Sequence, residues 1–510
     1  MTQQGSTTTA PARAGAREWI ALIVLTLAVT LLAVDGTVLA LAVPALTEAL
    51  SATSTQVLWI GDVYSLALAG LLVTMGNMAD RIGRKRLLLI GAIGFGLSSA
   101  LAAFALNAEM LILARAVLGI SGATIMPSTL AIIRSTFLDA RQRTRAIAIW
   151  SAGATAGAAL GPLVGGALLE NFWWGSVFLI NIPVMLLVVG LGIPLLTESR
   201  NEARAPIDLV SALLSFATIV PIVYAIKTVV KDGLTLTVAI AAIVGIAAGV
   251  VFVRRQRRLT HPLIDVRLFG NPAFSGAVVA NAVAIFALSG LLFFFSQYLQ
   301  LVRGYSPLVA GLAELPATIA SMLAAVAVGW VLGRLGRGRA IGIGLLVTAL
   351  AMVLLALAEG LPNYIWLALA LALASGALSI SSAVSVDTIV TVVPRSRAGA
   401  ASSISETAYE LGIALGIAVL GSVLNAVYRG SVHVPDHLVT DDRAALTDSL
   451  AAANQALAER LPEVFAAAQE AFTTAMQITS VVAAVIIAAA GILALILIPN
   501  TKMQDADSAR

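Results

Sequence analysis

The sequence predicts an all-α membrane protein of about fourteen membrane-spanning helices. Hydrophobic residues make up 59% of the 510 residues and charged residues only 11%, against about 25% charged residues in soluble domains. The apolar residues form long continuous runs, each sufficient to cross the ~30 Å hydrocarbon core as a helix. These runs do not alternate polar and apolar residues as the strands of a membrane β-barrel do.

Windows of about nineteen residues locate the spans to within a few residues. The first run follows a polar tail and is too long for the apolar core of a cleaved signal peptide, so we interpret it as an uncleaved span. The expected spans are 19–41, 57–78, 87–106, 110–136, 145–169, 175–196, 207–229, 234–253, 274–300, 308–333, 340–358, 363–391, 399–427 and 474–498.

The basic residues of the loops indicate the orientation. With loops assigned alternately, most arginines fall on the side of the N-terminus, for example in the segments 81–86, 254–258 and 334–339. The other side holds few basic residues, among them Lys227 and Lys231. Because positive residues collect on the cytoplasmic side, both termini are expected in the cytoplasm. Their dispersion over many short loops explains the net charge of +4 without a nucleic-acid partner.

One short motif occurs twice. The segment 76–86 repeats as 329–339, with glycines and arginines at one constant offset that takes Gly83 to Gly336 and Arg84 to Arg337. The repeat predicts two related six-helix halves. Repeated halves are typical of secondary transporters, which bind their substrate at the interface between the repeats.

The repeat and the spans together suggest a division of the chain. The parts are a cytoplasmic N-terminal tail (1–18), an N-terminal six-helix half (19–196), two inserted helices (207–253), a C-terminal six-helix half (274–498) and a cytoplasmic C-terminal tail (499–510). The C-terminal half includes an extracytoplasmic loop, 430–473. Its segment 442–469 is rich in helix-forming residues and predicts one or two helices, while the role of the loop beyond that of a connector stays open.

Four motifs follow one another along the chain. Each combines charged, aromatic or small residues at fixed spacing. They are Asp35-x-Thr37-Val38 in the first span, Trp59-x-x-Asp62-x-Tyr64 in the second, Gly76-x-x-x-Asp80-Arg81-x-Gly83-Arg84 in the loop after it, and Gly153-x-x-x-Gly157-x-x-x-Gly161-Pro162-x-x-Gly165-Gly166 in the fifth.

Together these motifs resemble the major facilitator superfamily, and within it the fourteen-span drug:proton antiporters of the QacA type, which export quaternary ammonium compounds. The resemblance covers essentially the whole chain. It implies the major facilitator fold, a conformational latch at the loop motif, an antiporter motif in the fifth span and a place in the cell membrane. In the fourth span, Arg115 is followed by Leu118 where glutamine is common in the superfamily.

Acidic residues within the spans are the candidates for binding substrate and protons. A charge at the centre of a spanning helix costs at least ~2.5 to 3.5 kcal/mol on insertion scales, so each acidic residue within a span requires a structural or functional explanation. The candidates are Asp35, Asp62, Glu314, Asp387, Glu406 and Glu410. Asp35 has a structural alternative, a hydrogen bond to Thr37 or to a neighbouring helix, and Asp62 has a similar one. Asp387 has an alternative position at the membrane–water interface. We expect Arg115 to pair with a carboxylate or to face water, and the resemblance implies a role for it in proton movement.

The span 399–427 is the most informative. Ser402, Glu406 and Glu410 recur every four residues and share one helix face. Two buried carboxylates one turn apart repel each other, so one is expected to hold a proton. A lipophilic cation and a proton would then compete for the same site. The alternative is a polar seam that joins helices.

Three aromatic residues are candidates for stacking on a cationic substrate. They are Trp59, Tyr64 and Tyr409. A cation over an aromatic ring is attracted by the ring electrons. Packing or anchoring at the membrane surface is the alternative for each.

The sequence thus favours a proton-coupled exporter of lipophilic cations. We expect small lipophilic cations, protons and membrane lipid as partners, a monomer, no cofactor and no enzymatic activity. No G-x-x-x-x-G-K-[S/T] loop is present, so an ATP-driven pump is disfavoured, and the absence of cysteine with only 3 histidines disfavours a metal centre. Two alternatives stay open: an exporter of an anionic or neutral metabolite, lipid or natural product, and a membrane sensor that binds without transport.

Overall fold

The computed structural model describes residues 14–200, 208–260, 262–394 and 397–500, and within these ranges its regular elements are all helices. It contains 14 helical spans that are long and apolar enough to cross a membrane. A helix satisfies its backbone hydrogen bonds internally, which lipid requires. The predicted all-α fold with fourteen transmembrane helices is confirmed.

The first six spans pack into one bundle. The helices are α1 (Ala16–Leu50), α2 (Ser54–Ile82), α3 (Arg84–Ala103), α4 (Ala108–Thr136), α5 (Ala140–Asn171), α6 (Ser176–Leu179) and α7 (Asn181–Leu195), the last two forming one span. Thr53, Asn107 and Asp139 each cap the helix that follows by accepting a backbone N–H at its first turn. α1 packs along α5, and α4 packs along α2 and α3.

The last six spans pack into a second bundle. The helices are α10 (Pro272–Gln297) with its continuation η2 (Tyr298–Val302), α11 (Pro307–Ala313), α12 (Leu315–Leu335), α13 (Arg337–Glu359), α14 (Tyr364–Thr391), α15 (Ala398–Ser431) and α18 (Pro462–Leu497). α10 packs along α15, and α14 packs along α12 and α13. The pairing of helices therefore repeats between the halves, as the motif in the sequence does.

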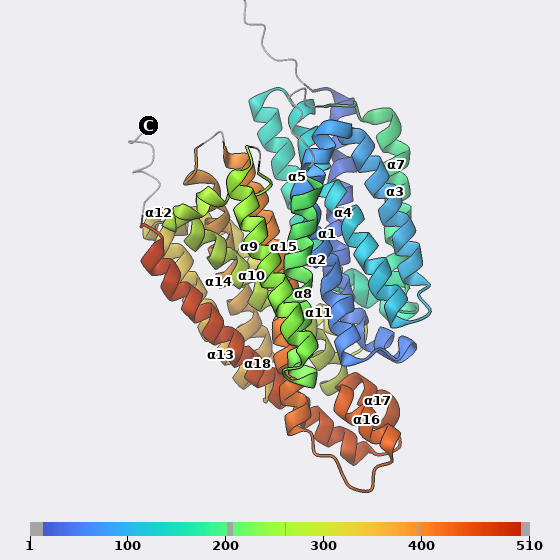
Figure 1. Cartoon of the computed structure of the whole chain (residues 1–510). Coiled ribbons are helices and arrows are strands. Elements are labelled where there is room, and N and C mark those ends of the chain that lie inside the picture. The colour runs from blue at the N-terminus through green and yellow to red at the C-terminus, as the bar shows by residue number, and fades with distance from the viewer. Residues whose placement is uncertain (1–13, 201–207, 261, 395–396, 501–510) are drawn as a thin grey trace, which may run out of the picture.

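The two inserted helices lie along the seam between the halves (Figure 1). α8 (Leu209–Asp232) packs against α2 of the first bundle and α15 of the second, and α9 (Leu236–Arg258) packs on α8. The short helix η1 (Val266–Gly270) leads from α9 to α10. α8 is therefore the helix of the inserted pair that can contribute side chains to the interface between the halves.

The connection between α15 and α18 differs from the expected loop 430–473. It contains α16 (Thr440–Asp448) and α17 (Leu450–Leu457), as the helix-forming segment predicts, but α18 begins at Pro462 and not at 474. Hydropathy windows detect only the apolar part of a helix, whereas proline in the first turn and the alanines that follow favour an earlier start. α1 likewise runs beyond the predicted 41 to Leu50.

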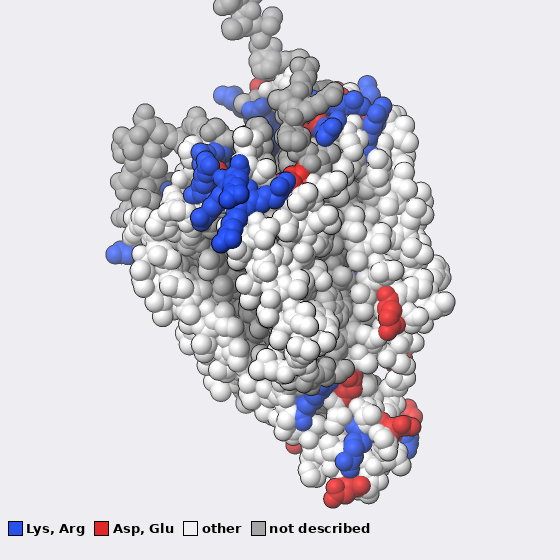
Figure 2. Space-filling model, viewed as in Figure 1, with Lys and Arg blue, Asp and Glu red and all other residues white. Residues whose placement is uncertain are grey.

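Lysine and arginine gather at one end of the bundle (Figure 2). This end, here called the basic end, is where α1 begins and α18 ends (Figure 1), and it carries Arg255, Arg257 and Arg258 in the last turn of α9. α16 and α17 lie at the opposite end, here called the α16–α17 end. This concentration of basic residues at one end agrees with the distribution of arginines in the sequence. The prediction that both termini lie in the cytoplasm depends on that distribution.

Candidate functional site

A buried polar network occupies the N-terminal half. Asp35 on α1 forms an ion pair with Arg115 on α4, with Oδ2 3.1 Å from Nη1, and both side chains are almost completely buried. Asn181, the first residue of α7, donates from Nδ2 to the other oxygen of Asp35 at 2.8 Å and to Ser99 Oγ at 3.1 Å. Arg115 therefore pairs with a carboxylate, as expected. Of the structural alternatives stated for Asp35, the hydrogen bond to a neighbouring helix is present, whereas Thr37 donates to backbone carbonyls of its own helix.

Arg115 also connects this network to α2. Its Nε donates to the carbonyl of Ile60 at 3.1 Å, and its guanidinium lies 4.8 Å from the ring centroid of Tyr64. Tyr64 is only 4% exposed. Tyr64, which was predicted to stack on a cationic substrate, thus already lies against the guanidinium of Arg115.

A second buried ion pair joins α2 to α8. Lys227 Nζ lies 2.6 Å from Asp62 Oδ2, and both side chains are 0% exposed. The same ammonium lies 3.6 Å from the ring centroid of Trp59. The sequence analysis counted Lys227, near the end of the predicted span 207–229, among the bases of the sparsely charged side and gave it no partner. Its carboxylate partner keeps it inside the bundle, because an unpaired buried charge would be much costlier.

The acidic pair of α15 lies at the contact between the two halves. Glu406 and Glu410 are half-buried and close enough to interact electrostatically. Glu410 lies within hydrogen-bonding reach of Ser65 on α2 and near Tyr64, while its Oε2 has no hydrogen-bond partner in the described structure. Among the described residues, neither acid forms an ion pair with a base. Tyr409 beside them is 38% exposed.

Two further acids are buried in the C-terminal half. Glu314 lies at the break between α11 and α12 and is 6% exposed, and its Oε1 has no partner among the described residues. Glu359 ends α13 and accepts a hydrogen bond from Ser480 on α18 at 3.1 Å. Sequence reasoning passed over Glu359 because it stands at the predicted end of a span, where a charge needs no explanation.

The basic end holds two corresponding ion pairs. Asp80 and Arg84 of the loop motif pair at 2.8 Å, and Arg337, the repeat counterpart of Arg84, pairs with Asp387 on α14 at 3.1 Å. The side chain of Asp387 is 41% exposed, and its alternative position at the membrane–water interface stays a prediction. Arg81, the third residue of the expected latch, is exposed.

Glycine is required where the loop motif turns. Gly83 has a φ of 122°, a conformation that residues with a side chain rarely adopt. A Cβ there would also overlap the carboxylate of Glu198, which accepts the backbone N–H groups of Lys85 and Arg86. Gly76, by contrast, would make only an ordinary contact with Pro127.

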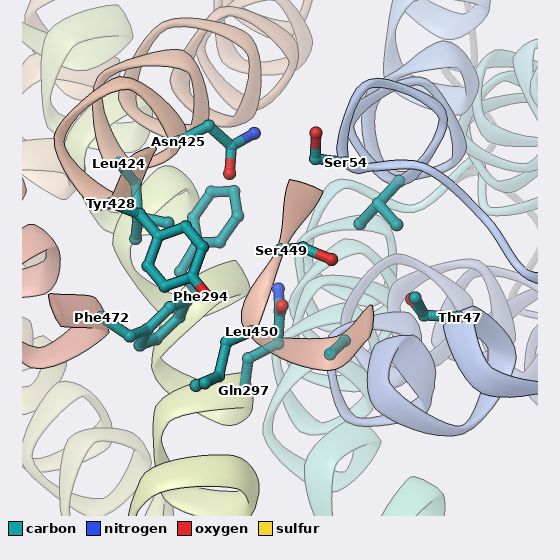
Figure 3. Close-up of a pocket in the computed structure, with 12 residues that line it drawn as sticks. Thr47, Ser54, Phe294, Gln297, Leu424, Asn425, Tyr428, Ser449, Leu450 and Phe472 are labelled. Carbon is teal, nitrogen blue, oxygen red and sulfur yellow. The ribbon is translucent and has the colours of Figure 1, made fainter. Parts of the chain in front are cut away.

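The halves are hydrogen-bonded to each other at the α16–α17 end. Gln300 donates to the carbonyl of Leu41 at 3.0 Å, and the backbone N–H of Ser54 donates to Asp448, which ends α16, at 2.9 Å. A surface hollow of about 290 Å³ lies there between the end of α1 and helices α16 and α17, lined among others by Ser51, Asp448 and Gln455. Figure 3 shows a smaller, deeper cavity of about 20 Å³ between Ser54, Phe294, Tyr428 and the start of α17. It has room for about one water molecule, not for a substrate. The ion pairs of Arg84 and Arg337 at the basic end stay within one half.

This arrangement of two repeated six-helix bundles agrees with comparisons to known proteins. A family model described as Major Facilitator Superfamily matches residues 25–417. The chain belongs to the major facilitator superfamily. It is therefore a transporter and not an enzyme, and a multi-pass protein of the cell membrane.

Several members of the superfamily are similar over nearly the whole chain. Multidrug efflux pump LfrA of Mycolicibacterium smegmatis is 46% identical, covering 95% of this chain and 96% of the relative. Methyl viologen resistance protein SmvA of Salmonella typhimurium is 36% identical, covering 88% and 90%. The inward-facing, unoccupied crystal structure of a bacterial homolog to the human lysosomal transporter Spinster matches with a TM-score of 0.68 and 19% identity, covering 94% and 98%. That similarity shows the shared fold.

The glycine run of this major facilitator protein forms a close contact between helices. A Cβ on Gly153, Gly157, Gly161 or Gly165 would overlap residues of α1, and one on Gly166 would overlap Pro307 on α11 of the other half. Small residues let helices approach in this way. Pro162, whose ring cannot continue the hydrogen-bond ladder, lies inside the continuous α5 with its carbonyl against Gly311. The motif thus packs against the helix that carries Asp35.

Substitution of one of these glycines tests that packing. Gly157→Ala is expected to destabilise the protein by about 1 to 3 kcal/mol, because the new methyl group would overlap the backbone carbonyl of Thr30. The measurement is thermal unfolding of the purified protein in detergent. Gly190→Ala on α7 is the matched control, since a Cβ there meets nothing within 4 Å. Equal melting temperatures for the two variants would contradict the close α1–α5 contact.

Sequence reasoning missed three polar partners in this transporter. Asn181, Lys227 and Ser65 each contact a candidate acid from another helix. A signal was available for the first two, because both lie within predicted spans, where a polar residue needs a partner. Ser65 carried no such signal, since serine is common in membrane helices.

Proposed function

We propose that this protein is a proton-coupled multidrug antiporter that exports lipophilic cations, among them quaternary ammonium compounds, dyes and biocides. The observation that carries the proposal is the pair Glu406 and Glu410, which lies where α15 meets α2 and has no basic partner among the described residues. A carboxylate without a counter-ion in a low-dielectric site binds either a proton or a cation. Competition between the two is sufficient to couple their movements.

The other acids have different roles in this proposal. Asp35 and Asp62 are each neutralised by a base and shielded from water, so a proton or cation reaches them only when the pair separates. Glu314 lies apart at the break in the tenth span and is a secondary candidate. Tyr409 is the exposed aromatic ring beside the acidic pair and is the candidate for contact with substrate.

The proposed direction of transport follows from charge and contact. We infer that the basic end faces the cytoplasm, because positive residues collect on that side. Hydrogen bonds join the halves at the α16–α17 end, so this conformation is the one that receives substrate from the cytoplasm. The latch residues Asp80, Arg81 and Arg84 would then stabilise the opposite, outward-open conformation by closing the basic end.

The relatives support export of cations. One is named a multidrug efflux pump and another a methyl viologen resistance protein. Methyl viologen carries quaternary nitrogens, which bear a charge at every pH and donate no hydrogen bond. Such a cation is attracted by a carboxylate and by an aromatic face.

Transport in liposomes tests the proposal. With purified protein in liposomes of acidic lumen, ethidium is expected to enter as protons leave, and its fluorescence on enclosed DNA reports the uptake. One pH unit supplies about 1.4 kcal/mol per proton, which supports about tenfold accumulation for one-to-one exchange with a monovalent cation. Nigericin, which collapses the gradient, is the control. Uptake that continues unchanged after nigericin would refute proton coupling, and uptake of neutral dyes alone would refute the preference for cations.

A further inference from the structure

The ammonium group of Lys227 occupies a site that does not provide acceptors for all of its hydrogen-bond donors. A lysine ammonium has three N–H donors. Here one carboxylate oxygen of Asp62 lies at 2.6 Å, and the face of Trp59 lies on another side at 3.6 Å from the ring centroid. Beyond the ion pair, the described structure gives Lys227 Nζ no hydrogen-bond acceptor. At least two donors therefore lack an acceptor.

The same surroundings suit a different cation. A quaternary ammonium group has no N–H to satisfy, and it is stabilised by a negative charge together with an aromatic face. Asp62 and Trp59 stand one turn apart on α2 and offer these two features on one helix face. Burial strengthens the attraction, because little solvent screens the charges.

The position of this pair connects it to the moving parts of the transporter. Leu66 on α2, Val223 on α8 and Ala418 on α15 form one apolar cluster, with Trp59 at its edge. Lys227 stands one turn beyond Val223 on the same face of α8. The pair therefore lies near the seam where the halves meet.

Lys227 is not the only attachment of α8. Phe216 packs against Gly70 of α2, where a Cβ would clash with the ring, and Ser215 donates to the carbonyl of Gly70 at 3.3 Å. These contacts hold α8 to α2 independently of the ion pair. A purely structural purpose therefore leaves the buried charge unexplained, since replacing a buried ion pair with apolar residues is often neutral or stabilising.

We propose that Lys227 is a tethered cation, which occupies the site formed by Asp62 and Trp59 until the quaternary group of a substrate displaces it. The inference rests on the proposed function and deepens it by naming a residue that determines substrate selectivity. The flexible stem of lysine lets the ammonium withdraw and return, so Asp62 is never left buried without a counter-ion. Arg115, although near enough to Asp62 to interact electrostatically, is bound to Asp35.

Binding without a pH gradient tests this inference separately from transport. The probes are benzyltrimethylammonium and protonated benzylamine, which share one body and differ in the head group, titrated calorimetrically into protein in lipid nanodiscs. Lys227→Gln is expected to tighten binding of the quaternary probe about tenfold, a change of about 1.4 kcal/mol. The primary amine should gain less, because its N–H groups lack acceptors as those of Lys227 do.

Three variants control the measurement. Lys227→Arg keeps the charge and should bind like the wild type, and Ser215→Ala weakens the other α8–α2 contact without changing selectivity. The double variant Asp62→Asn, Lys227→Gln should lose the gain. Unchanged affinity in Lys227→Gln, or equal changes for both probes, would overturn the proposal.

A second readout uses the unaltered protein and so does not depend on the folding of variants. Saturating benzyltrimethylammonium is expected to increase reductive methylation of Lys227, measured by peptide mass spectrometry relative to Lys85. Saturable binding that leaves the methylation of Lys227 unchanged would overturn the proposal. If the protein exports ethidium with a pH gradient but neither affinity nor methylation changes at Lys227, only this inference is overturned. If the expected changes in affinity and methylation are found but no export is measured, only the proposed function is overturned.

Discussion

Arg115→Gln is expected to abolish export and to destabilise the protein by about 3 to 5 kcal/mol, the cost of leaving one partner of a buried ion pair uncompensated. Asp35 would keep the bond from Asn181 at 2.8 Å but lose its only basic partner in the described structure. The variant would also lose the bond from Arg115 Nε to Ile60, which connects α4 to α2. Thermal unfolding in detergent and ethidium uptake in liposomes measure the two effects.

A paired variant separates structure from function. Asp35→Asn combined with Arg115→Gln removes both charges, so most of the lost stability should return, because no unpaired charge remains buried. Export should not return, since the site can no longer exchange a proton. A double variant that transports at the rate of the wild type would show that the pair only holds the helices together.

Replacing both acids of α15 is expected to lower export strongly without a loss of stability. Glu406→Gln with Glu410→Gln should lower gradient-driven ethidium uptake about a hundredfold, the effect of losing two interactions of about 1.4 kcal/mol each. The fold should persist, because neither acid forms an ion pair in the described structure and glutamine can still bond Ser65. Uptake and melting temperature of the same preparation are the measurements.

The matched control changes a buried glutamate away from the seam. Glu359 lies at the α13–α18 contact, where it accepts a hydrogen bond from Ser480, and it has no place in the proposed mechanism. Glu359→Gln should therefore leave uptake unchanged. If the α15 double variant retained gradient-driven uptake, the competition of protons and cations for these two acids would be wrong.

The number of spans was predictable because it depends on local chemistry. A run such as 234–253 is apolar on every side, and a helix is the structure that buries its backbone groups within lipid. The ends of helices were less predictable. α18 begins at Pro462 because alanine-rich polar turns continue the helix beyond the membrane, and hydropathy does not register them.

The candidate acids were also predictable, because a charged residue within a long apolar run is rare and can be identified directly in the sequence. Their partners were not. Asp62 and Lys227 stand far apart along the chain, and no spacing rule relates residues on different helices. The same holds for Asn181, which reaches Asp35 only because α7 packs against α1.

The sequence by itself determined that this chain crosses the membrane fourteen times as two related halves with acids among its helices, because the free energy of each segment in lipid depends on its own residues. Only the tertiary structure decided which of those acids are neutralised. Asp35 and Asp62 meet a base, and Glu406 and Glu410 do not, because charge pairing depends on which helix faces are brought within a few ångströms.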